Sequence, residues 1–465
     1  MPPHPHTHWR DAQAWKSFGL EMSTPSDETC KMFDATLTQM VNHYDDEALG
    51  GMEKCLERML TADPEFVLGL AMKNAFASKH VYQDFTHAKE VYRMMEIASL
   101  PHVNKRERNH AIAVKLLSEG KSKAASLVWE DILVEHPTDI LAAKFLHDTY
   151  ILNGNSLGLR HSCAGVVPYW KPDMPFYGDM LSMYAFGLEE TNTFTEAEKY
   201  AQKALEINRH DTWATHCIAH INEMTGEARK GVKFMEQTEN NWNDDGLQCH
   251  NYWHWALHYF EMGEFETAVS LLDKQILPTM SKNKSWFSLT DAASLCFRLE
   301  AEGRPCYDIG KRWSSCRDVA SEHLDHHMMS YADFHVLMSF VRGGDKELTD
   351  RMISGIKETI RNDEGDIAVD YKELTLPVME ALMAFDEGEY DTAVTIMRPL
   401  KYQMSRIGGS NAQRDVFNLL TIHAGIRSKS PESQKYASNL LMERKQLKAE
   451  SPLAERLLQR IVLAH

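Results

Sequence analysis

Residues that interrupt helices or cross-link chains are scarce in this sequence of 465 residues. Its 24 Gly and 16 Pro lie mostly between segments of helical periodicity, and runs with strict period-2 alternation are almost absent. The eight cysteines are scattered, and no two form a Cys-x-x-Cys pair. This pattern disfavours a disulfide framework and a zinc ribbon. We therefore expect a mostly helical protein with reduced thiols.

The sequence also lacks a basic excess and a long apolar run. Fifty Lys and Arg stand against 67 Asp and Glu, which gives a net charge of −17. An acidic chain disfavours a broad phosphate-binding surface, so we expect no nucleic-acid partner. No stretch approaches the roughly 18 apolar residues of a membrane helix, and no secretory signal pattern is present at residues 1–15. We expect a soluble, cytoplasmic protein without membrane contact.

Several enzyme signatures are missing as well. The sequence contains no Gly-x-x-x-x-Gly-Lys phosphate loop, no Gly-x-Gly-x-x-Gly after a strand pattern and no Gly-x-Ser-x-Gly. It also contains no His-Glu-x-x-His zinc motif. Nucleotide kinases, dehydrogenases and α/β-hydrolases are therefore disfavoured.

A repeated helical hairpin pattern is present instead. In MGEFETAV, Gly263, Phe265 and Ala268 occupy turn, aromatic and small-residue positions, and EGEYDTAV at 387–394 repeats this spacing. Related patterns occur at 120–137 and 192–211. Small residues at a helix crossing let two helices approach, and an aromatic ring fills the remaining gap. Four copies predict an all-α fold, an α-solenoid of tetratricopeptide-like helical hairpins in one continuous superhelix.

The repeats predict a single solenoid domain over residues 15–465, preceded by a flexible N-terminal tail at 1–14. Two helices at 431–465 are expected to cap the solenoid. The expected hairpins lie near residues 105–137, 176–209, 210–245, 249–280 and 374–404.

Histidines recur at helical spacing on two of these hairpins. His216, His220 and Glu223 stand at i, i+4 and i+7, which places them on one helical face, and His250 and His254 repeat the spacing. Four imidazoles from successive hairpins could surround a divalent metal, with Glu223 as a ligand or general base. Alternatively, each pair fills packing positions and donates hydrogen bonds without any metal.

Two further polar strings are candidates for binding. His147 and Asp148 are adjacent on one expected helix, although adjacent side chains point about 100° apart. In GGSNAQRDVF, the glycines end one helix, and the next begins with Gln413, Arg414 and Asp415. The start of that helix could receive a substrate carboxylate or phosphate. The alternative is an ordinary helix cap with an Arg–Asp pair.

The sequence resembles the tetratricopeptide repeat protein 38 family. The similarity runs nearly end to end and includes EALGGMEKC (47–55), EHPTDILAAKFLHDTY (135–150), CHNYWHWAL (249–257) and GGSNAQRDVFN (408–418). It implies a soluble tetratricopeptide-like helical protein and no established reaction. His258 stands where the family is expected to have another residue, often an aromatic one.

These observations support two main hypotheses and a weaker third. The first is a binding protein whose concave groove, with Tyr252, Trp253 and Trp255 accessible, holds a small molecule or peptide. The ligand-binding residues would be His147, Trp253, Gln413, Arg414 and Asp415. The second is a metal-dependent or acid–base enzyme with a buried polar site, in which Glu223, His220, His254 and Asp148 are catalytic and His216, His220, His250 and His254 hold the metal. The third is a structural scaffold or homodimer.

Overall fold

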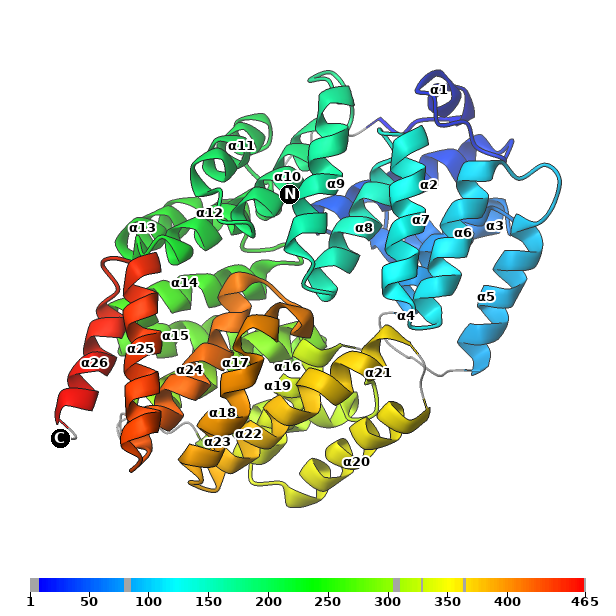
Figure 1. Ribbon diagram of the computed structural model, residues 1–465. Helices are drawn as coiled ribbons and strands as arrows, with labels where there is room; N and C mark the ends of the chain where they lie inside the picture. The colour runs from blue at the N-terminus through cyan, green and yellow to red at the C-terminus, as the bar shows by residue number, and fades with distance from the viewer. Residues whose placement is uncertain (1–7, 79–84, 304–309, 328, 363–364, 464–465) are drawn as a thin grey trace. The chain divides into compact units, whose positions relative to one another are not determined.

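The computed structural model describes residues 8–78, 85–303, 310–327, 329–362 and 365–463, and every regular element within these ranges is a helix (Figure 1). The predicted all-α fold of helical hairpins is confirmed. Where the sequence predicted one uninterrupted domain, the chain forms two compact units. Unit 1 comprises Met1–Cys217 and Asn240–Leu247, and unit 2 comprises Ile218–Glu239 and Gln248–His465.

Unit 1 contains eleven complete α-helices within the described residues and one short 3-10 helix. These are α1 (Ala12–Ser17), α2 (Asp27–Asn42), α3 (Gly51–Ala62), α4 (Val67–Ser78), α5 (Phe85–Ala98), α6 (Lys105–Ser118), α7 (Ser122–Glu135), α8 (Ile140–Leu152), α9 (Ser156–Val166), η1 (Val167–Tyr169), α10 (Tyr177–Glu189) and α11 (Phe194–Ile207). Helix α12 (Thr212–Met224) begins in unit 1 and ends in unit 2, and η2 (Glu239–Asn241) also spans the division.

Unit 2 continues the succession of hairpins. Its elements are α13 (Ala228–Thr238), α14 (Gln248–Met262), α15 (Phe265–Leu271), η3 (Leu272–Ile276), α16 (Leu277–Asn283), α17 (Trp286–Ala301), α18 (Gly310–Ala320), η4 (Ser321–His323), α19 (Ser330–Arg342), α20 (Lys346–Asn362), α21 (Asp366–Asp370), η5 (Tyr371–Thr375), α22 (Leu376–Asp386), α23 (Tyr390–Met397), η6 (Arg398–Ile407), α24 (Asn411–Arg427), α25 (Pro431–Leu447) and α26 (Pro452–Leu463).

The five predicted hairpins correspond to α6–α7, α10–α11, α12–α13, α14–α15 and α22–α23. The small residues of the pattern lie in the helix crossings: Ala197, Ala201 and Ala204 of α11 are fully buried, and α11 packs along α10. Side chains of this size let the two helices approach closely, as the repeat pattern required.

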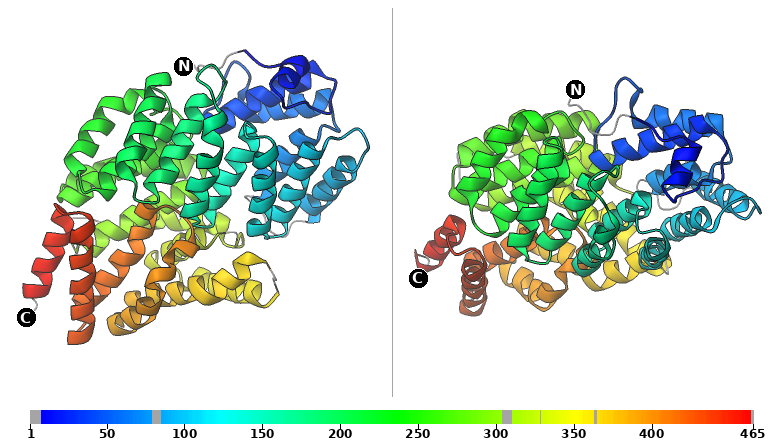
Figure 2. Two further views of the ribbon diagram at one scale, coloured as in Figure 1. Left: turned by 45° about the horizontal axis from the view of Figure 1, so that its top comes forward. Right: turned by 90° about the horizontal axis from the view of Figure 1, so that it is seen from above.

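The two C-terminal helices are present, and the second of them also packs against another helix of unit 2. α25 and α26 lie side by side (Figure 2), and α26 also packs against α14. Arg456 donates to the carbonyl oxygens of Glu261 and Phe260 over 2.8 and 3.0 Å, and Ser451 donates to the Glu261 carboxylate. Helix α26 therefore covers α14, which carries two of the candidate histidines.

The expected tail at residues 1–14 differs from the structure in its second half, while residues 1–7 lie outside the described ranges. Asp11 caps the N-terminus of α1 by accepting from Ala14 N at 2.8 Å. The Arg10 guanidinium lies 2.6 Å from buried Asp34 and 3.5 Å above the Trp15 ring. Arg10 is therefore held on unit 1 by an ion pair and an aromatic ring, and Asp11 caps α1, whereas His8 and Gln13 are exposed.

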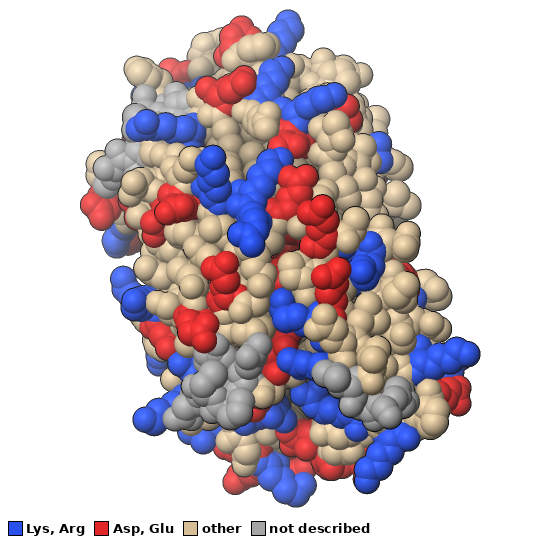
Figure 3. All heavy atoms as spheres, turned by 90° about the vertical axis from the view of Figure 1, so that its left-hand side faces the viewer, with Lys and Arg blue, Asp and Glu red and all other residues tan. Residues whose placement is uncertain are grey.

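Lys and Arg are interspersed with Asp and Glu over the face shown in Figure 3, and neither sign forms a broad region there. Among the described residues, none of the helices combines the length and apolar character needed to cross a membrane.

Candidate metal centre

Two buried helices carry the histidine pairs that the sequence singled out. Nearly every side chain of α14 is buried, because α13, α15, α17 and α26 pack around it. His250 and His254 lie one turn apart on α14, and the part of α12 in unit 2 supplies His220 and Glu223. The ring centroids of His220 and His254 are 4.4 Å apart. These four predicted residues lie together in unit 2.

His250 and His254, two of the three histidines of α14, are each hydrogen-bonded through Nδ1 to a buried carboxylate. His250 Nδ1 lies 2.8 Å from Oδ1 of Asp291, and His254 Nδ1 lies 3.2 Å from Oε2 of Glu223. A proton on Nδ1 would be donated to the carboxylate in both pairs and would leave Nε2 as the acceptor nitrogen. Each ring then presents the lone pair of Nε2 on its other side. Carboxylate–histidine pairs of this kind orient metal-binding imidazoles.

The Nε2 atoms of His250 and His254 face each other at 3.3 Å. Two lone pairs at this distance repel, so a shared proton or a metal ion is needed to stabilise the arrangement. Two nitrogens bound to one zinc ion at about 2.0–2.1 Å, with a tetrahedral angle between the bonds, lie about 3.3–3.4 Å apart. The observed separation matches two ligands on one tetrahedral ion, and it equally matches an N–H···N hydrogen bond between the two rings.

His220 supplies a third imidazole. One ring nitrogen from each of His220, His250 and His254 lies within 4.8 Å of the others. His216 precedes His220 by one turn on the same face of α12, in the part of that helix that belongs to unit 1. Unit 2 alone thus brings together three histidines, the number of protein ligands in many catalytic zinc sites.

Three charged or polar groups near the centre were missed by sequence reasoning. Asp291 and Arg298 are on α17, and Tyr331 is on α19. Burial raises the pKa of Asp291, against the effect of nearby His250 and Arg298. Burial also raises the pKa of Tyr331, which interacts electrostatically with Arg298 and Asp291. Asp291 lies 41 residues from His250 in sequence, and no spacing rule connects the two.

Within the described part of unit 2, the other buried histidines have no such carboxylate partner. His258 is 1% exposed, and neither of its ring nitrogens has a hydrogen-bond partner among the described residues. Its ring packs on α13, where a Cβ added to Gly231 would lie 2.4 Å from Nε2. Burial lowers the pKa of His258 to about 3 and that of His335 also to about 3. His258 is therefore a neutral packing group.

The expectation of an accessible aromatic groove on α14 is wrong. Trp253 is 0% exposed, Tyr252 is 2% exposed and Trp255 is 8% exposed. Trp253 stacks on His250, with ring centroids 5.2 Å apart, and the guanidinium of Arg298 lies 5.5 Å from its ring. These side chains are core residues because helices cover α14 on several sides.

His147 and Asp148 are on α8 of unit 1 and have different neighbours. The His147 ring packs against Phe186 and Trp213, with centroids 6.0 and 5.4 Å away. Burial lowers the pKa of His147 to about 3. Asp148 Oδ1 accepts a hydrogen bond from Lys144 Nζ at 2.7 Å. The two side chains diverge, as their adjacency on a helix requires.

Gln413 and Arg414 stabilise the start of α24. Ser410 Oγ accepts from Gln413 N, and Gln413 Oε1 accepts from Ser410 N at 2.9 Å, which completes a capping box. Arg414 donates to the Gly409 carbonyl oxygen and, over 2.7 Å, to Asn411 Oδ1.

Asp415 forms its ion pair with a different arginine from the one the sequence indicated. Both of its oxygens lie 2.7 Å from Nη1 of Arg444 on α25. Burial alone would raise the pKa of Asp415, but Arg444 holds it down at about 2. Arg444 also pairs with Glu261 at 3.1 Å, so this network joins α14, α24 and α25.

Comparison with known proteins gives distant similarities. No model of a protein family matches the chain. Among solved structures, the chain is similar to a human IFIT1 dimer with m7Gppp-AAAA (12% identity, 97% of each chain, TM-score 0.42). It is also similar to yeast Tom70 (10% identity, 93% of this chain and 92% of that one, TM-score 0.40). A tetratricopeptide repeat protein from Parabacteroides merdae shares 11% identity over 72% of this chain and 99% of its own, with a TM-score of 0.29. The all-α hairpin architecture is established by the chain's own helices.

Proposed function

We propose that unit 2 binds one divalent transition-metal ion between α14 and the part of α12 that belongs to unit 2, with His220, His250 and His254 as ligands. The observation that carries this proposal is the 3.3 Å separation of the His250 and His254 Nε2 atoms, with a carboxylate behind each ring. Asp291 and Glu223 would accept hydrogen bonds from Nδ1 of His250 and His254, respectively, and so fix the tautomer of each ring.

The donor set favours zinc over the alkaline-earth ions. Imidazole nitrogen suits zinc, copper, nickel and iron, whereas magnesium and calcium prefer oxygen ligands. Zinc accepts tetrahedral coordination readily, and its nitrogen bonds match the observed Nε2 separation. We therefore choose zinc as the ion to test first.

The test is the metal content of the protein purified without chelator, measured by inductively coupled plasma mass spectrometry together with the native and denatured masses. We expect about one ion per chain, either as purified or after zinc loading and removal of unbound metal. In the double variant His220→Ala and His254→Ala, the ion should be lost while the far-UV circular dichroism remains near that of the wild type.

The matched control is the double variant His335→Ala and His423→Ala. Both residues are 0% exposed and belong to unit 2, so the control removes the same atoms from equally buried positions outside the centre. It should retain the metal. A wild-type protein that takes up no zinc, or a control that loses metal as fully as the test variant, would refute the proposal and favour a shared proton between the two Nε2 atoms.

A metal-dependent hydrolase is the second candidate function. It rests on the three histidines of the proposed site, because a zinc ion with three protein ligands keeps a position open for water. Zinc lowers the pKa of bound water to about 7 and so supplies a nucleophile. Zinc-loaded protein should hydrolyse p-nitrophenyl acetate faster than chelated protein, and His254→Ala should abolish the difference. Equal rates with and without zinc would count against this activity.

We also propose that the chain belongs to the tetratricopeptide repeat protein 38 family, because CHNYWHWAL (249–257) and GGSNAQRDVF (408–417) are specific strings. A cytoplasmic location is supported by the seven described cysteines, all of which are free and buried. The peptide or small-molecule ligand of a concave groove and the homodimer stay predictions.

A further inference from the structure

Two histidines of unit 2 meet outside the centre on α12 and α14. His323 ends η4, and His326 follows it by three residues in the segment that leads to α19. Their Nδ1 atoms lie 3.1 Å apart, and this contact is only partly buried. His323 is 8% exposed, His326 is partly exposed and Asp325 is exposed. The two rings therefore lie near the surface of unit 2 and not in its core.

The other ring nitrogen of His323 determines its tautomer. His323 Nε2 lies 2.7 Å from the carbonyl oxygen of Lys284, the residue that follows α16. A carbonyl oxygen only accepts hydrogen bonds, so Nε2 carries a proton. In the neutral ring, Nδ1 then presents its lone pair toward His326. Metal-binding histidines commonly donate through the far nitrogen to a backbone carbonyl in this way.

The orientation of the two rings favours lone pairs that converge on one point. The ring centroids are 4.8 Å apart, and the ring planes are inclined by 74°. A straight N–H···N hydrogen bond of the same length would place the centroids about 5.4 Å apart, because each nitrogen lies about 1.15 Å from its centroid. At least one ring is therefore turned away from the line that joins the two nitrogens.

A single ion position agrees with both measured distances. Consider an ion about 2.0–2.1 Å from each Nδ1, on the line from each ring centroid through that nitrogen. With the nitrogens 3.1 Å apart, this position places the centroids about 4.8–4.9 Å apart. The angle between the two bonds to the ion is then about 95–102°, between the square-planar and tetrahedral values. Both rings already have the orientation that such an ion requires.

We propose that His323 and His326 form a second metal site of unit 2, which binds one late first-row divalent ion through their Nδ1 atoms, with water in the remaining positions. Two imidazoles and water are a nitrogen and oxygen donor set, which suits copper(II) and nickel(II). Copper(II) binds such sites most strongly among the divalent ions of this row, so it is the ion to test. This site shares no residue with the centre on α12 and α14 and does not depend on it.

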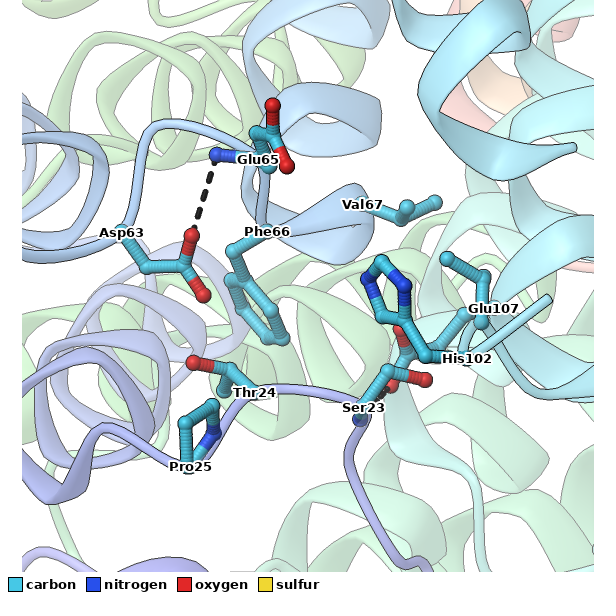
Figure 4. A pocket seen from close by; sticks show the side chains of 10 residues that line it. Ser23, Thr24, Pro25, Asp63, Glu65, Phe66, Val67, His102 and Glu107 are labelled. Carbon is cyan, nitrogen blue, oxygen red and sulfur yellow. Dashed lines mark hydrogen bonds between the residues drawn. The ribbon is translucent and has the colours of Figure 1, made fainter. Parts of the chain in front are cut away.

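Unit 1 offers a matched control for this pair. His102 is an exposed histidine that lines a cavity of about 210 Å³, formed by the loops that join α1 to α2, α3 to α4 and α5 to α6 (Figure 4). Asp63, Glu65 and Glu107 also line this cavity, and His102 is the only imidazole among the lining residues. Glu107 Oε2 is buried and has no hydrogen-bond partner among the described residues. His102 therefore tests whether one imidazole beside carboxylates is enough to bind copper.

Equilibrium dialysis against buffered copper(II), followed by metal analysis, tests the proposal. His326→Ala should bind one copper ion fewer per chain than the wild type, and His102→Ala should bind as many as the wild type. This difference is expected whether or not the centre on α12 and α14 binds copper, because that centre is intact in all three proteins. Equal copper content in the wild type and in His326→Ala would overturn the proposal and leave an N–H···N hydrogen bond between the two rings.

A footprint of the wild-type protein tests the same site without a substitution. Diethyl pyrocarbonate acylates accessible imidazole nitrogens that carry no proton, and peptide mass spectrometry locates the products. Copper(II) should slow the acylation of His326 at least tenfold and leave that of His102 unchanged. This measurement decides the question if circular dichroism shows that His326→Ala is unfolded. Equal rates for His326 with and without copper, or equal protection of His326 and His102, would also overturn the proposal.

Discussion

His254 and His258 lie one turn apart on α14, but the groups around their rings differ. His254 has Glu223 at Nδ1 and His250 at Nε2, whereas neither nitrogen of His258 has a hydrogen-bond partner among the described residues. Both rings are buried. The difference shows that a buried ring without a hydrogen-bond partner is a packing group, while a carboxylate at Nδ1 fixes the orientation of the ring. His258 instead rests on Gly231.

The largest difference between His254 and His258 is expected when each imidazole ring is removed in turn. His254→Leu should abolish zinc binding, because it deletes one of the two facing Nε2 atoms. His258→Leu should keep about one zinc per chain and change the free energy of unfolding by less than about 1.5 kcal/mol, because an apolar side chain replaces a ring without hydrogen bonds. Zinc titration and chemical denaturation measure both. Metal loss in His258→Leu would contradict the comparison.

The carboxylate partner is the next feature to test. Asp291→Asn keeps the shape of the side chain but removes the charge that fixes the His250 tautomer, so zinc affinity should fall about 10- to 100-fold. The control is Asp333→Asn on α19. This buried carboxyl, whose pKa burial raises to about 7, accepts from Tyr371 and from Met329 N. Competition with a chromophoric chelator gives both affinities. If Asp333→Asn lowers the zinc affinity more than Asp291→Asn does, Asp291 does not orient His250 for metal binding.

The packing role of His258 predicts a sign reversal at Gly231. Gly231→Ala should destabilise the protein by about 2 kcal/mol, because the new Cβ would meet His258 Nε2 at 2.4 Å in a filled core. In the His258→Ala background the same change should stabilise the protein by up to about 1 kcal/mol, since alanine favours helix over glycine. A double-mutant cycle in urea measures the coupling. Additive effects would show that the two residues do not meet.

The last test of the comparison uses pH. Because burial lowers the pKa of His258 to about 3, the unfolded state binds the proton between about pH 6.5 and 3. The stability from the neutral ring is therefore full above about pH 6.5 and declines as the pH falls, by up to about 1.4 kcal/mol per pH unit. Chelated His258→Leu should lose that much less stability per unit in this window than the chelated wild type. Identical slopes in urea denaturation would contradict a neutral buried His258.

Much of the fold could be predicted from local signals. The hairpin at Gly263 and Phe265 and the capping box at Ser410 follow from turn, aromatic and capping residues that act within a few positions of the chain. The placement of His250 and His254 on one face of a helix was also predictable, because residues four apart lie one turn apart. These features depend on neighbours in sequence.

Other parts of the site could not be predicted because their partners are distant in sequence. Asp291 meets His250 across 41 residues, and Arg444 pairs with Asp415 across 29 and with Glu261 across 183. Distance in sequence also explains why the expectation of an accessible Trp253 was wrong. Nearly all of α14 is buried, and the helices that cover it come from other parts of the chain. The unit 1 cavity likewise needs three separate loops.

The sequence by itself determined that the chain is helical, where most hairpins turn and which histidines share a helical face, because propensity and periodicity are local. Only the tertiary structure decided which histidines face a carboxylate, which face a glycine and which carboxylate oxygen of Glu107 stays without a donor. Those outcomes depend on desolvation and on hydrogen-bond geometry, which arise only when helices pack together.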